Sequence, residues 1–101
     1  MALRNVFPMN TEELKQKLVT DGFIHVYEWL DIPNQEYPIH KHQGRVGMHI
    51  LKGEVTFSLR NETVILSQGD YFEVPVGVEH TAQVGDQGCH FLVGEMIEGD
   101  S

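Results

Sequence analysis

Short runs of β-branched and aromatic residues follow one another from Phe23 almost to the end of the chain. Turn residues such as Gly, Asn, Asp and Pro separate these runs, so a strand is expected about every ten residues. Even spacing of this kind predicts an all-β sandwich, jelly roll or closed barrel. A parallel sheet is not indicated, because the sequence shows no helical pattern between the runs. The seven predicted strands are FIHVYEWL, RVGMHIL, EVTFSLR, ETVILS, YFEVP, HTAQV and CHFLVGEMI.

One short helix is predicted ahead of these strands. Asn10 and Glu13 have the spacing of a capping box, in which each side chain bonds the backbone amide of the other residue. Apolar residues then recur at helical intervals through Leu18, and Gly22 is expected to stop the helix. We therefore expect an N-terminal segment with a short helix, residues 1–22, and a β-barrel over residues 23–101, within one domain.

Charge and cysteine content limit the expected partners and compartment. The net charge of −8 repels phosphate backbones and anionic lipid headgroups, so neither nucleic acid nor a membrane is an expected partner. Cys89 is the single cysteine and cannot form an internal disulfide. The N-terminus turns polar without the apolar stretch of a signal peptide. A cytoplasmic protein is the resulting expectation.

Two histidines at alternate positions are the first sign of a metal site. In an extended strand, His40 and His42 project to the same side, which lets two imidazoles chelate one ion. His80, just after the turn that contains Pro75 and Gly77, is the best candidate for a third ligand. The remaining histidines are interpreted as hydrogen-bonded packing residues; they are His25, His49 and His90.

The segment GDYFEVPVGVEH around this turn carries a second signal. Gly69 supplies an unhindered turn, Pro75 ends a strand because it lacks an amide donor, and Gly77 permits a positive φ. His80 then opens the returning strand.

These residues resemble the two motifs of the cupin family. Gly69, Pro75, Gly77 and His80 match the second motif, G(X)5PXG(X)2H(X)3N, although Val84 replaces its final Asn. The first motif is matched by the pair of histidines and a glycine, but its Glu is replaced by a valine. The matching residues of the first motif are His40, His42 and Gly53, and Val46 stands at the position of its Glu.

The resemblance covers roughly residues 27–95 and implies a double-stranded β-helix, the cupin jelly-roll barrel, with a metal inside one mouth. It also implies a homodimer, and an exposed strand edge offers a physical reason for pairing. With the family's Glu, the expected metal would be Mn or Fe. Three neutral histidines without it suit Zn, Fe, Ni or Cu and favour an anionic or thiolate ligand. This arrangement resembles that of the thiol dioxygenase cupins.

Apolar residues near the predicted site suggest a pocket for a small organic ligand. Val46, Met48 and Ile50 share one side of their strand, and Phe57 and Phe72 are expected to add to the interior. They could equally form barrel core without a cavity. The alternating residues His25, Tyr27 and Trp29 could face the pocket or a dimer partner, and the partner is slightly favoured.

Three functions remain open at this point. The chain could be a metal-dependent enzyme with dioxygenase-like, isomerase or hydrolase activity, a non-catalytic small-molecule-binding or sensory cupin module, or a structural barrel. One divalent transition metal, namely Fe, Zn, Ni, Cu or Mn, is expected as cofactor. The sequence assigns no catalytic acid or base.

Overall fold

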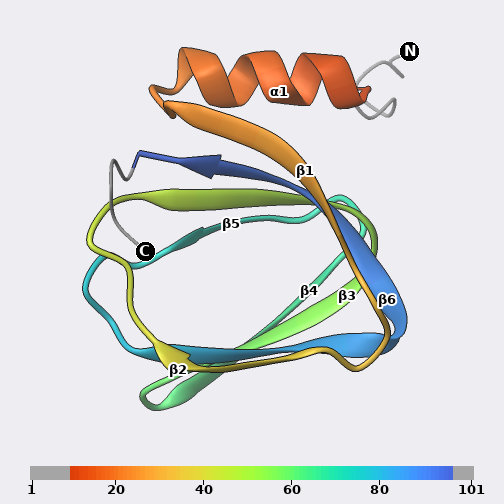
Figure 1. Ribbon diagram of the computed structural model, residues 1–101, viewed down its shortest axis with the longest axis vertical. Helices are drawn as coiled ribbons and strands as arrows, with labels where there is room; N and C mark the ends of the chain where they lie inside the picture. Colours follow the sequence, from red (N-terminus) through yellow and green to blue (C-terminus); the bar gives the residue numbers. More distant parts are fainter. Residues whose placement is uncertain (1–9, 97–101) are drawn as a thin grey trace, which may run out of the picture.

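The computed structural model describes residues 10–96, which form a β-barrel with one helix lying against its outside (Figure 1). The elements, in chain order, are helix α1 (Thr11–Thr20) and strands β1 (His25–Asp31), β2 (Glu36–His40), β3 (Val46–Leu59), β4 (Glu62–Ser67), β5 (Tyr71–Val74) and β6 (His80–Glu95). Within residues 10–96 there is no helix with the length and apolar character that crossing a membrane requires.

Strands β3 and β6 are the two middle strands of the sheet that forms the barrel wall. They pair with each other over most of their length, and every other strand pairs with one of them, always antiparallel. Strand β1 and strand β2 both join β6, while β4 and β5 join β3. The all-β jelly-roll barrel with a short N-terminal helix, expected from the sequence, is therefore confirmed.

The expectation of seven separate strands is wrong, because two predicted turns lie inside long bent strands. Gly53 and Gly88 both have positive φ, 90° and 82°, within β3 and β6. The β3–β6 pairing shifts register on either side of Gly53. Each long strand bends here and continues around the barrel, as Figure 1 shows for β6. Strand β2 (Glu36–His40) was not predicted, because a proline, Pro38, is its central residue and both Pro38 and the neighbouring Ile39 are exposed, so no regular alternation marks it.

Inward-facing side chains of both long strands fill the barrel. They alternate with outward-facing ones, so Phe91 and Val93 lie in the barrel core while Leu92 lies under the helix. On the helix side, Leu18 and Leu92 are both 0% exposed and pack with Phe23. The helix thus covers one outer face of the sheet and leaves the barrel interior to the strands.

Both ends of the helix follow the sequence prediction. The Asn10 side chain accepts a bond from the Glu13 amide at 2.8 Å, and the Glu13 carboxylate accepts one from the Asn10 amide at 3.0 Å. Gly22, with φ 101°, redirects the chain after the last turn.

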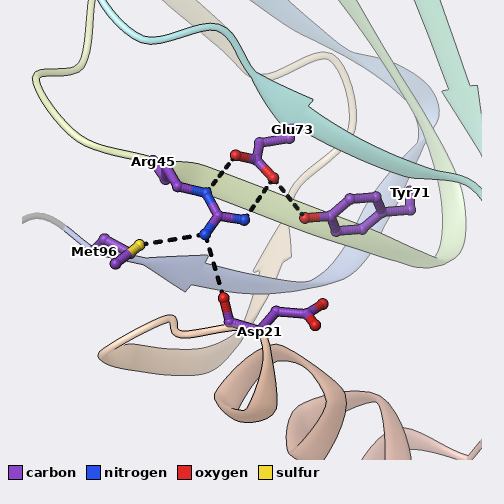
Figure 2. A network of polar contacts seen from close by, with 5 residues as sticks. All are labelled: Asp21, Arg45, Tyr71, Glu73 and Met96. Carbon is purple, nitrogen blue, oxygen red and sulfur yellow. Dashed lines mark hydrogen bonds and ion pairs between the residues drawn. The ribbon is translucent and has the colours of Figure 1, made fainter.

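Arg45 links the helix end to two parts of the barrel (Figure 2). Its guanidinium donates two hydrogen bonds to the Glu73 carboxylate, at 2.6 and 3.0 Å, and one to the Asp21 carbonyl at 3.2 Å. It also lies 4.5 Å from the centre of the Phe23 ring and contacts the Met96 sulfur. The Arg45 guanidinium therefore contacts the residue after α1, strand β5 and the last described residue of the chain.

The variant Glu73→Gln is expected to lower the melting temperature near neutral pH but not in acid. The hydrogen bonds from Arg45 hold the pKa of this carboxyl below its ordinary value of 4.5. Because the folded-state pKa is the lower one, the ion pair stabilises the fold fully above the unfolded value, and this is lost as pH falls through the folded pKa. The effect is small because both side chains are more than a third exposed.

Thermal melts of both proteins from about pH 7 to about pH 3 would test this, since these values bracket the titration of a carboxyl. The two melting temperatures should converge in acid. A difference that stays constant across this range would contradict the assignment.

Candidate metal centre and adjoining cavity

Strand pairing brings the three predicted histidines together. His40 ends β2 and lies directly opposite His80, the first residue of β6, while His42 follows β2 by two residues. The ring centroids of His40 and His80 are 4.3 Å apart, and that of His42 is 4.9 Å from the first and 5.2 Å from the second. Their nitrogen ligand atoms all lie within 4.8 Å of one another, a group that could hold a metal ion.

Backbone carbonyls orient two of these rings. The Nδ1 atom of His40 lies 2.7 Å from the Pro38 carbonyl oxygen, and that of His80 lies 3.0 Å from the Val78 carbonyl oxygen. A carbonyl only accepts, so Nδ1 of each neutral ring is the donor and Nε2 keeps its lone pair. Metal-binding histidines in proteins are commonly held in this way, which makes the donor set suited to a divalent ion.

Burial keeps His80 in the form that binds metals. His80 is 2% exposed, whereas His40 is partly exposed. Loss of solvation lowers the pKa of His80, with His40 adding to this and the Val78 carbonyl opposing it. A neutral imidazole is the ligand form, so His80 needs to lose no proton near neutral pH.

A cavity of about 260 Å³ adjoins the histidines. Of the residues predicted to line a pocket, Val46, Met48 and Phe57 are on its wall. Ile50 and Phe72 are not among the lining residues: Ile50 lies in the core beside the register shift of β3, and Phe72 packs against the Phe57 ring at 5.4 Å. The wall is formed by Tyr27, Trp29, Asp31, Tyr37, His40, His42, Val46, Met48, Val55, Phe57, Val74, His80, Ala82, Phe91, Val93 and Glu95.

The sequence interpretation missed a buried carboxylate in this wall. Asp31 is 8% exposed; the Tyr37 hydroxyl donates to both of its oxygens at 2.7 Å, and Trp29 Nε1 donates at 2.9 Å. Burial and the bond to Asp31 raise the pKa of Tyr37 to about 12, so its hydroxyl stays protonated. Asp31 was interpreted as a turn residue, yet its alternation with Tyr27 and Trp29 was a signal that it faces the same side.

A second carboxylate lies at another point of the wall. The Tyr27 hydroxyl donates to Glu95 at 2.6 Å, and burial, together with this bond, raises the pKa of Tyr27. Glu95 is the partner of Val46 in the β3–β6 pairing, so a carboxylate is found one strand away from the position at which the family motif has its Glu.

Two further expectations of the sequence concern the aromatic residues of β1 and the histidines outside the cluster. Tyr27 and Trp29, for which the sequence left both a pocket and a dimer partner open, line the cavity while staying 37% and 48% exposed, so contact with a partner stays a prediction. Of the other histidines, His25 is exposed rather than packed. His49 lies against the Tyr71 ring at 4.5 Å, and His90 Nε2 lies 3.5 Å from a Glu28 oxygen.

Comparison with known proteins agrees with the fold. A family model described as "Cupin domain" matches residues 28–94. An RmlC-like cupin from Shewanella frigidimarina is 19% identical, with a TM-score of 0.64, and the match covers 76% of this chain and 69% of that one. KdgF from Halomonas sp. is 17% identical, with a TM-score of 0.60, and 72% and 69% are covered.

The DMSP lyase DddQ from Ruegeria pomeroyi is 25% identical, with a TM-score of 0.63. The match covers 73% of this chain but only 38% of the lyase, so the chain spans little more than a third of that protein. No curated protein matches the sequence. Since the family model matches more than half of the chain, this protein belongs to the cupin family.

Proposed function

We propose that this cupin binds one divalent transition metal ion through His40, His42 and His80 and takes a small organic ligand into the adjoining cavity. The observation that carries the proposal is the convergence of three imidazoles at a cavity of about 260 Å³. Two of the rings are already held by backbone carbonyls in the tautomer that leaves Nε2 for the ion. Imidazole nitrogens suit Zn, Fe, Ni or Cu, and Mn is the further candidate.

The surroundings of the histidines favour a ligand that itself reaches the metal. Val46, in place of the motif's Glu, is 4% exposed and presents only methyl groups to the cavity. Three neutral imidazoles leave the charge of a dication uncompensated, which favours a carboxylate, thiolate or enolate oxygen of the ligand in an open coordination position. A bound divalent ion would polarise such a ligand or lower the pKa of bound water.

Catalysis is the candidate that a specific observation favours over passive binding. The Tyr37 hydroxyl, protonated and held by buried Asp31, lies in the same cavity as the histidines and could supply a proton to a ligand. A positioned proton donor of this kind can serve an isomerase, a hydrolase or a lyase, and it is also compatible with a dioxygenase-like reaction. The likeness to a DMSP lyase supports this direction. A sensory or ligand-binding module is the alternative, in which the ligand is bound but never consumed.

Elemental analysis of tag-free protein as isolated tests the proposal. About one equivalent of a single transition metal per chain is expected, and a variant carrying His40→Ala and His80→Ala should contain none. A matched variant carrying His25→Ala and His90→Ala removes the same number of imidazoles outside the cluster and should keep the metal. Metal-free protein whose melting temperature does not change on addition of Zn, Fe, Ni, Cu or Mn would rule out the metal site.

The homodimer and the cytoplasmic location expected from the sequence stay predictions. Leu30 and Ile32, which are 75% and 67% exposed at the end of strand β1, support a homodimer, because large apolar side chains gathered at a strand edge favour pairing. Sedimentation of the full chain would show twice the mass of one chain if the dimer exists.

A further inference from the structure

One wall of the cavity is both acidic and aromatic. Tyr27, Trp29 and Asp31 alternate along β1 and all face the cavity. The rings of Tyr27 and Trp29 meet edge to face, with centroids 6.4 Å apart. Trp29 Nε1 and the Tyr37 hydroxyl both donate to Asp31, so the carboxylate also fixes the orientation of two aromatic side chains.

The charge of this wall is not balanced by a basic side chain. Tyr37 and Trp29 are neutral donors, so they satisfy the hydrogen-bonding capacity of Asp31 without neutralising it. A second carboxylate, Glu95, lines the same cavity, and no Lys or Arg is among the described lining residues. A carboxylate that is 8% exposed gains most from a cation that enters and shares its poorly solvated surroundings.

We infer that the cavity selects small organic cations or zwitterions, with a primary or quaternary ammonium group lying against Asp31 and the rings of Tyr27 and Trp29. Aromatic faces attract such cations through the ring quadrupole, and the attraction increases when water is excluded. In a zwitterion, the anionic end would reach the metal held by the histidines. This second contact rests on the proposed function, whereas recognition of the cation does not.

A pair of probes with the same shape isolates the contribution of charge. Glycine betaine and 3,3-dimethylbutanoate both carry a carboxylate and a branched trimethyl head, but only the betaine head is positive. Trp29 is the single tryptophan of the chain and lines the cavity, so its fluorescence reports binding directly. In zinc-loaded protein, betaine is expected to bind on the order of tenfold more tightly than the neutral-headed probe.

Variants then assign the selectivity to this wall. Asp31→Asn keeps the shape and the acceptor for Trp29 but removes the charge, so most of the tenfold preference should disappear. Glu28→Gln removes an equal charge from the opposite side of the same strand. This variant should keep the preference for betaine, since Glu28 does not line the cavity. If Asp31→Asn does not fold, Tyr27→Leu tests the aromatic part and should weaken betaine binding more than binding of the other probe.

The outcomes separate this inference from the metal proposal. Equal affinity for the two probes in zinc-loaded protein would overturn the inference and leave the metal site intact. If zinc does not bind, the proposed function fails, and metal-free protein is tested with choline against 3,3-dimethylbutanol, its neutral analogue. Preference for choline would then support the cationic site, and equal or absent binding of these two probes would overturn it.

Discussion

The variant His42→Ala is expected to weaken zinc binding by about ten- to a hundredfold or more while leaving the barrel folded. Loss of an outer-shell partner of a metal ligand typically costs about 10- to 100-fold in affinity, so loss of the ligand itself should cost no less. His42 is the ligand best suited to this test, because it lies between β2 and β3 rather than within a strand. His80, in contrast, is 2% exposed and packs near the Phe57 ring, so its truncation would also disturb the core.

Titration calorimetry against zinc, with a competing chelator where binding is tight, measures this effect. The matched control is His25→Ala, which removes an exposed imidazole that lies outside the cluster. The control should bind zinc as the parent does, and melting temperatures without metal should agree among all three proteins. An unchanged zinc affinity in His42→Ala would remove this residue from the site and leave a two-histidine arrangement.

The sequence was sufficient to predict the barrel but not how its strands bend. Alternating apolar residues and turn residues marked the position of every described strand except β2, since burial of one face imposes that period. The same evidence made Gly53 and Gly88 look like turns that separate strands. Whether a glycine ends a strand or bends it depends on the partner strand, and the pairing of β3 with β6 is not visible in the local sequence.

The site was predictable in part, for a related reason. His40 and His42 were found from their spacing and His80 from its motif, because metal ligands leave a distinctive residue type at fixed intervals. The acidic wall was missed: Asp31 was interpreted as the first residue of a turn, and Tyr37 lies in strand β2, which the sequence did not predict. Their contact depends on a side-chain bond between two strands that both pair with β6.

The variant Gly53→Ala is expected to destabilise the barrel by roughly 2–5 kcal/mol, or to prevent folding, because two costs combine. A left-handed backbone costs a residue with a Cβ about 1–2 kcal/mol, and Gly53 has φ 90°. A Cβ here would also overlap the carbonyl oxygen of Gly88 and come within 2.9 Å of Cys89 Cα. Both obstacles are backbone atoms of the partner strand, so no side chain can move aside, and overpacking costs about 1–3 kcal/mol more.

Gly69→Ala separates these two costs. Gly69 has nearly the same backbone angle, φ 94°, but a Cβ there would meet no atom within 4 Å. It should therefore show only the backbone cost of about 1–2 kcal/mol. Urea unfolding of the parent and both variants measures the free energies of unfolding. Similar losses in the two variants would mean that β3 and β6 can move apart at Gly53 to admit a Cβ, and that the contact with Gly88 and Cys89 adds no cost of its own.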